Sequence, residues 1–182
     1  MLDIRPSNET DIADIDALHQ AAFGEPEGPE IVELVNLMFG DKSAKPLLSL
    51  VATENGELLG HILFSKVEIV GSDNPVSAQI LAPMAVAPER HGEGIGGKLI
   101  AEGLKRLKAD GVELVFVLGH PTFYPRYGFK PAGVLGFEAT HPIPDEYADA
   151  WMVQELTDGV IESCQGKVMC SDILGQPKYW GP

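Results

Sequence analysis

Cysteine is scarce in this chain of 182 residues, which holds two, Cys164 and Cys170. They lie close together near the C-terminus without an accompanying cluster of cysteine and histidine, so the spacing of a metal site is missing. Structural disulfides are rare in cytosolic proteins. We therefore expect both cysteines to be packing residues, and the sequence predicts no bound metal.

Long apolar runs are lacking as well. Hydrophobic residues make up 45% of the chain and charged residues 22%, the composition of an ordinary globular protein. No stretch offers the roughly 20 apolar residues of a membrane-spanning helix, and residues 1–5 do not have the pattern of a signal peptide. We expect a cytoplasmic protein without a membrane partner. Its length favours one domain over residues 1–182, with no repeat, low-complexity stretch or linker.

Basic residues are also in short supply. The chain has 13 lysines and arginines against 27 aspartates and glutamates, a net charge of −14. This balance argues against nucleic acid as a partner, because its phosphate backbone attracts clustered positive charge. An acidic surface suits a cationic amine substrate, although acidity also simply keeps a protein in solution.

Glycine, in contrast, is concentrated in one place. Four glycines lie within residues 92–97, after an apolar run that ends at Ala87 and before a helical pattern over residues 98–108. A strand that turns through glycines into a helix presents backbone N–H groups at the positive end of the helix dipole. Glycine lets the backbone approach a ligand and adopt positive φ. The stretch therefore predicts a phosphate-binding loop.

Two well-known phosphate loops do not fit this stretch. A Walker-type loop needs Ser or Thr after Gly-Lys, and here Leu99 follows Gly97-Lys98. A dinucleotide fingerprint is present in the spacing of the glycines, but it needs an acidic residue at the end of the next strand. Residues 117–120 contain none.

A third loop does fit. Residues 91–96 resemble motif A of the GNAT superfamily of N-acetyltransferases, Gln/Arg-x-x-Gly-x-Gly/Ala. The chain departs from it at its first position, since histidine does not offer the side-chain contact that Gln or Arg usually makes there, and Arg90 is a candidate to supply it. Lys98, Arg126 and Lys130 are further candidates for local positive charge. The resemblance implies that the loop binds the pyrophosphate of acetyl-coenzyme A through His91, Gly92, Glu93, Gly94, Ile95, Gly96 and Gly97.

A second stretch carries the same resemblance. Phe123-Tyr124 and Gly128-Phe129 match the GNAT segment Phe-Tyr-x-x-x-Gly-Phe. The resemblance implies that Tyr124 lies near the sulfur of coenzyme A and protonates the leaving thiolate, and that Arg126 contacts the cofactor. His120 directly follows a predicted strand, where it is a candidate to orient substrate or act as a base. A structural hydrogen bond that caps the turn is the alternative for His120.

The strand before the loop contains Pro83, which cannot donate to a sheet ladder and predicts a bulge or an edge. In the GNAT fold this strand splays from the next one. The resemblance implies that the backbone of Met84, Ala85 and Val86 pairs with the pantetheine arm, and that an N–H near Ala85 or Val86 polarises the thioester carbonyl.

The remaining pattern predicts an α/β (α+β) fold with a mixed, mostly antiparallel twisted sheet flanked by helices, as in GNAT proteins. We expect strands over 2–5, 47–53, 58–69, 77–86, 113–118 and 151–156, with 113–118 parallel to 77–86. Helices follow residue 8 and residue 30, with an acidic connector over 25–30 between them. A further strand is expected from residue 134, and residues 159–169 are expected to form one more strand or a loose turn. The resemblance is clearest over residues 1–140. The tail, with Tyr179 and Trp180, is expected to dock on the domain or on a partner subunit, which leaves a homodimer open.

The resemblance implies direct transfer of an acetyl group from acetyl-coenzyme A to a primary amine of a small molecule or peptide. The general base stays open, since no carboxylate lies in residues 77–81. One candidate is a water molecule held by Gln79. The others are the side chains of His120, Glu25 and Glu27. The alternative function is an inactive acyl-coenzyme A sensor or interaction module.

Overall fold

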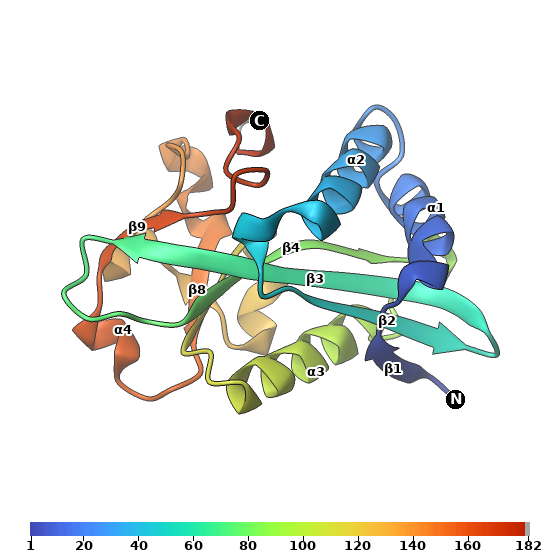
Figure 1. Cartoon of the computed structure of the whole chain (residues 1–182), viewed down its shortest axis with the longest axis horizontal. Coiled ribbons are helices and arrows are strands. Elements are labelled where there is room, and N and C mark those ends of the chain that lie inside the picture. Colours follow the sequence, from blue (N-terminus) through green and yellow to red (C-terminus); the bar gives the residue numbers. More distant parts are fainter. Residues whose placement is uncertain (181–182) are drawn as a thin grey trace.

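The computed structural model describes residues 1–180 and contains a nine-stranded twisted sheet with helices on both faces. Helices α1 (Ile12–Phe23) and α2 (Glu27–Gly40) lie on one side of the long strand β3, and α3 (Ile95–Ala109) lies on the other (Figure 1). The strands are β1 (Asp3–Pro6), β2 (Leu48–Glu54), β3 (Glu57–Val70), β4 (Ala78–Val86), β5 (Leu114–Leu118), β6 (Lys130–Pro131), β7 (Phe137–Glu138), β8 (Trp151–Glu155) and β9 (Gly166–Met169).

The strand order is β1-β2-β3-β4-β5-β8-β6, and β9 pairs with β3 and β7. The neighbours are antiparallel except for β4–β5 and β7–β9, which are parallel. The fold class predicted from the sequence is therefore confirmed, including the parallel strand after α3. None of the helices within residues 1–180 is long and apolar enough to cross a membrane.

Helix α3 approaches the sheet closely because of a glycine. A Cβ atom on Gly103 would collide with the ring of Phe64 on β3. Phe64, Leu99 and Ile100 are fully buried in the core between α3 and the sheet. On the other face, Val35 and Ile15 of the two N-terminal helices pack on the sheet. Burial on both faces explains why the central strands read as nearly continuous apolar runs.

Strand β4 carries a bulge where the sequence predicts one. Ile62 of β3 lies opposite Met84, but Phe64 lies opposite Leu81, so two residues of β4, Ala82 and Pro83, face one residue of β3. The pairs between β4 and β5 run only from Ala78 to Leu81. Beyond the bulge, β4 is thus paired with β3 on one side, and its other side opens toward β5.

The predicted acidic connector is shorter than expected. Helix α2 begins at Glu27, so the expected loop over 25–30 is wrong beyond its first two residues. Glu27 and Glu30 lie in the first turn of α2, where the helix dipole favours negative charge. Pro29 is tolerated there because N–H groups of a first turn have no intrahelical partner.

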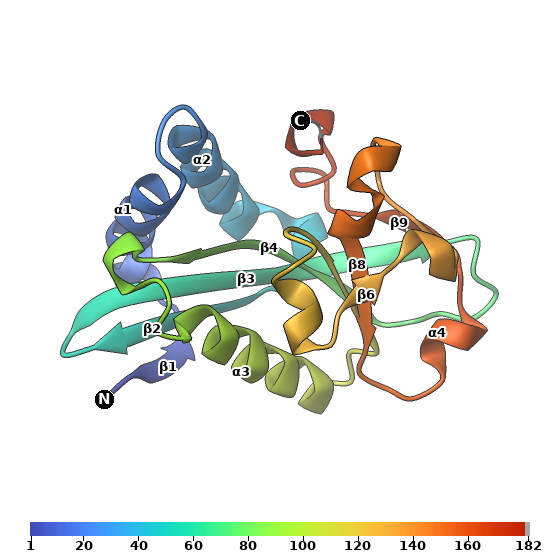
Figure 2. The same cartoon turned by 180° about the vertical axis from the view of Figure 1, so that it is seen from behind.

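The C-terminal third departs from the predicted boundaries. The strand expected from residue 134 begins only at Phe137, after a 3-10 turn over Gly133–Leu135. Residues 159–169 form helix α4 (Val160–Ser163) followed by β9. Trp180 is buried, and its indole N–H donates to the Leu174 carbonyl at 2.8 Å. The tail therefore docks on its own chain beside α2 and β8 (Figure 2), while residues 181–182 lie outside the described residues.

Candidate active site

The glycine loop connects β4 to α3. Gly92 and Gly94 have φ values of 85° and 81°, which favour glycine, and a Cβ atom on either would point into open space. Gly94 is the N-cap of α3 and has no side-chain cap, and the Lys98 N–H makes the first bond of the helix, to the Gly94 carbonyl. The N–H groups of residues 94–97 are thereby free for a ligand. Such a helix start is a ready anion site.

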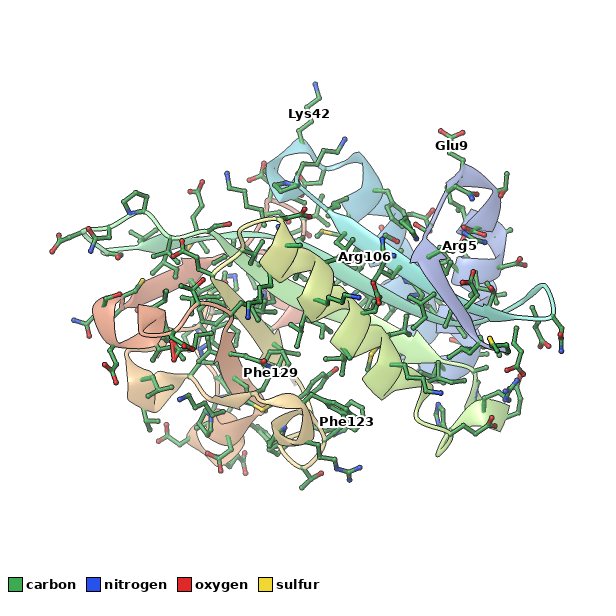
Figure 3. The ribbon with its side chains drawn as sticks, turned by 90° about the horizontal axis from the view of Figure 1, so that it is seen from below. Arg5, Glu9, Lys42, Arg106, Phe123 and Phe129 are labelled. Atoms are coloured by element: carbon green, nitrogen blue, oxygen red, sulfur yellow. The ribbon has the colours of Figure 1, made fainter. Side chains whose placement is uncertain are left out.

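The other two glycines of the loop serve packing. A Cβ on Gly97 would collide with the phenol of Tyr127, and one on Gly96 would lie 3.3 Å from Met84 Cε and 3.6 Å from Phe123 Cζ. The expectation that all four glycines exist for the ligand is therefore corrected. Gly97 lets Tyr127 of the second motif pack on the start of α3, whereas a Cβ on Gly96 would be tight only against the flexible end of the Met84 side chain. Phe123 and Phe129 lie between this helix and the segment that carries them (Figure 3).

His91 and Arg90 are engaged within the protein. His91 Nε2 donates to the Val86 carbonyl at 3.0 Å, so the ring fixes the end of β4. The Arg90 Nε donates to both carboxylate oxygens of Glu93, at 2.9 and 2.8 Å, and its Nη2 donates to Glu54 at 3.0 Å. Arg90 is thus not free to contact the ligand in place of His91, which corrects that expectation. Lys98 lines a hollow beside β1, where Leu2 and Ile4 are its neighbours.

Backbone groups of β4 face the gap toward β5 at two of the three predicted positions. The Ala87 N–H donates to the Leu59 carbonyl on β3. Hydrogen-bonded pairs alternate in an antiparallel ladder, so the next such pair is Ala85 with His61. Met84 and Val86 therefore direct N–H and C=O away from β3. The expectation that Ala85 offers its N–H to the ligand is corrected, because this group belongs to the ladder.

Tyr124 begins a 3-10 turn (Tyr124–Tyr127) after β5. Its ring packs against Gly119, which has no room for a Cβ, and lies edge-on to Phe123 and Phe129 at centroid distances of 5.1 and 5.8 Å. Burial raises the pKa of the phenol to about 12. The hydroxyl therefore keeps its proton at neutral pH, as a general acid must.

Two polar residues near Tyr124 in the sequence, His120 and Arg126, are exposed to solvent. His120 has an exposed side chain, and its carbonyl accepts from the N–H groups of Phe123 and Tyr124. The turn is therefore capped by the His120 backbone, and its ring is free for substrate. Arg126 is exposed, and its guanidinium lies 5.9 Å from the centre of the Phe123 ring.

The structure also places the candidates for the base. Gln79 donates to the Pro46 carbonyl at 3.1 Å and lies five residues before Met84, about 16 Å along the strand. Glu25 is exposed and accepts from Gln20 at 3.1 Å, and Glu27 is exposed at the start of α2. Residues 1–180 contain no group of three or more potential ligands arranged to hold a metal ion, and both cysteines are free thiols.

Two buried histidines were not found from the sequence. His19 of α1 and His61 of β3 are fully buried, with His19 Nε2 and His61 Nδ1 2.8 Å apart. His61 Nε2 lies 2.8 Å from Ser49 Oγ, which lies 2.6 Å from Ser7 Oγ. His19 Nδ1 has no hydrogen-bond partner in the described part of the chain. Burial lowers the pKa of His19 to about 4 and that of His61 to about 3, so both rings are neutral.

A bulged strand that splays from its parallel neighbour, followed by an uncapped glycine loop and a buried tyrosine, defines an acyl-coenzyme A transferase fold. The sequence model described as "Acetyltransferase (GNAT) domain" matches residues 3–132. The chain therefore belongs to the GNAT acetyltransferase family. It is an N-acetyltransferase that uses acetyl-coenzyme A as co-substrate.

Relatives of known sequence or structure agree with this assignment. The chain is 41% identical over 167 residues to a protein of Escherichia coli K12 named "Uncharacterized N-acetyltransferase YjhQ", covering 91% of this chain and 90% of that protein. The crystal structure of the Escherichia coli N-acetyltransferase YhbS with coenzyme A superimposes with a TM-score of 0.85, at 28% identity over 96% of this chain and 92% of that one. A GNAT acetyltransferase from Brucella melitensis with acetyl-coenzyme A gives a TM-score of 0.75, at 32% identity over 96% and 98%.

Proposed function

We propose that the protein transfers the acetyl group of acetyl-coenzyme A directly to a primary amine of a small molecule or peptide, within a ternary complex. The observation that carries this proposal is the orientation of the N–H groups of Met84 and Val86 on β4, which point away from β3. This part of β4 lies between the start of α3 and the second motif. Those groups suit the amides of the pantetheine arm. The relatives from Escherichia coli and Brucella melitensis were crystallised with coenzyme A and acetyl-coenzyme A, which supports the same ligand here.

Each part of the ligand has its own contacts in this proposal. The backbone N–H groups of residues 94–97 bind the pyrophosphate, with the helix dipole of α3 behind them, whereas the His91 N–H is engaged with the Pro88 carbonyl. Met84 and Val86 pair with the pantetheine arm. The Val86 N–H donates to the thioester oxygen, where negative charge develops as the amine attacks. Arg126 contacts the cofactor from the exposed side of the second motif.

The chemical step needs one acid and one base. The amine nitrogen attacks the thioester carbon, and the tetrahedral intermediate collapses with cleavage of the C–S bond. The thiolate takes the proton of Tyr124, whose phenol is neutral at physiological pH. His120, Glu25 and Glu27 are the candidates that accept the proton of the amine, since each is exposed and His120 lies four residues before Tyr124.

Calorimetric titration with acetyl-coenzyme A, NAD and ATP in parallel tests the ligand class. We expect binding of acetyl-coenzyme A alone. Gly94→Val should weaken it strongly, because the valine is strained at positive φ and its side chain occupies the open space before the loop. Gly111→Val is the matched control, since Gly111 also has positive φ (88°) and open space but lies at the far end of α3. Absence of acetyl-coenzyme A binding contradicts the proposal.

An inactive acyl-coenzyme A sensor is the second candidate, favoured by the lack of a carboxylate on β4. A screen of amine acceptors with thiol detection separates the two, because only an enzyme releases coenzyme A in an amine-dependent manner. We further propose that the chain acts in the cytoplasm as one domain, without nucleic acid or membrane. Sedimentation analysis decides between a monomer and a homodimer.

A further inference from the structure

The loop proposed for the pyrophosphate has an unusual balance of charge. Between Ala87 and Gly97 it carries two glutamates, Glu89 and Glu93, and one arginine, Arg90. A third carboxylate, that of Glu54, reaches the loop from the end of β2. Coenzyme A brings its own negative charge to this place, and unpaired carboxylates would repel it.

The guanidinium of Arg90 lies between two of these carboxylates. It contacts Glu93 through Nε and Glu54 through Nη2, at distances of 2.8 to 3.0 Å. The Arg90 and Glu54 side chains are 25% and 27% exposed, so their pair is better shielded from solvent than a typical surface ion pair, whereas the Glu93 side chain is 46% exposed. Hydrogen bonds to Glu93 and Glu54 raise the pKa of Arg90, which keeps its charge at every physiological pH.

We propose that Arg90 is a positioning residue for coenzyme A that offsets part of the negative charge of Glu54 and Glu93, without contacting the phosphates itself. The inference rests on the proposed function, because it assumes that the pyrophosphate binds at this loop. Its consequence is that the affinity for coenzyme A depends on Arg90 only while the two carboxylates are present.

Calorimetry with coenzyme A at low ionic strength tests this dependence. Arg90→Gln leaves Glu54 and Glu93 charged beside the ligand, and we expect about tenfold weaker binding from the loss of one positive charge several ångströms from the doubly charged pyrophosphate. At about 1 M NaCl the Debye length is only about 3 Å, so the difference between the variant and the wild type should shrink to about twofold. A difference that persists at high salt indicates damage to the loop and overturns the proposal.

A rescue experiment separates neutralisation from direct contact. The triple variant Arg90→Gln/Glu54→Gln/Glu93→Gln should bind at least as tightly as the wild type, because its cluster carries no net charge whereas that of the wild type carries one negative charge. Arg90→Gln/Glu89→Gln is the matched control: Glu89 lies in the same loop but forms no ion pair with Arg90 in residues 1–180, so Glu89→Gln should change the affinity by the same factor with and without Arg90. A triple variant as weak as Arg90→Gln means that Arg90 binds phosphate directly and overturns the proposal.

The same titrations distinguish this inference from the proposed function. If the wild-type protein does not bind coenzyme A, the proposed site fails and the role of Arg90 fails with it. If the wild type binds and Arg90→Gln binds equally well, the site stands and only the role of Arg90 is overturned.

Discussion

Tyr124 is the proposed general acid because its ring is buried beside the second motif and its phenol is protonated at neutral pH. Tyr124→Phe keeps the ring against Gly119 and removes the proton that the leaving thiolate takes. We expect kcat to fall about a hundredfold with the KM for acetyl-coenzyme A nearly unchanged, since general acid catalysis contributes about 10²–10⁴-fold. Steady-state kinetics with an active amine acceptor measures both constants. An unchanged kcat would remove Tyr124 from the chemistry.

The buried histidine pair makes stability depend on pH. His19 and His61 have pKa values of about 4 and about 3 in the folded protein, below the roughly 6.5 of an unfolded histidine. The unfolded chain therefore binds more protons between these values, and the free energy of unfolding falls as pH drops below about 6.5. The slope reaches at most about 1.4 kcal/mol per pH unit for each histidine.

Urea unfolding at pH 7 and pH 5 measures this slope above the range in which most carboxylates titrate. We expect the loss of stability between these pH values in the wild type to be much smaller in the double variant His19→Gln/His61→Gln. The control is His120→Gln, which removes an exposed histidine and should leave the slope unchanged. A wild type equally stable at both pH values contradicts neutral burial of the pair.

Helix α3 supplies the start of the phosphate loop and must be held close to the sheet. Gly103→Ala places a Cβ atom against the Phe64 ring. We expect a loss of about 1–3 kcal/mol in the free energy of unfolding from overpacking, measured by urea titration. Gly40→Ala, in α2 with open space around its Cα, is the control and should be neutral or stabilising by up to about 1 kcal/mol. An equal change in the free energy of unfolding in both variants would mean that α3 moves away from the sheet and accommodates the added methyl group without cost.

The elements could be predicted because their signals are local. Apolar runs bounded by glycine and proline mark β3, β4 and β5, and Pro83 marks the bulge within a few residues. The contacts that complete the site join residues far apart in the chain. Arg90 pairs with Glu54, 36 positions away, and Gly97 packs on Tyr127. Hydrophobic periodicity in the sequence does not indicate such long-range pairs. The prediction that Arg90 contacts the ligand was therefore wrong, and the buried histidine pair was not found.

The C-terminal segment contacts both the end of α2 and strand β8. Backbone N–H groups of Asp172 and Ile173 donate to Ser43 and Asp41, directly after α2. Near its end, the Trp180 ring lies edge-on to Trp151 of β8, with centroids 5.7 Å apart. The segment thus joins the α2 side of the sheet to the strand beside β5, and its removal should affect the fold as a whole.

Trp180→Ala tests that connection. The side chain is only 5% exposed and donates to the Leu174 carbonyl, so we expect a loss of about 3–5 kcal/mol in a single cooperative transition, measured by thermal and urea unfolding. Tyr179→Phe is the neighbouring control. The Tyr179 hydroxyl is buried and has no hydrogen-bond partner among residues 1–180, so its removal should leave stability equal or slightly higher. If Trp180→Ala unfolds in two steps, the tail is an independent unit and the core formed by α2, β5 and β8 stands without it.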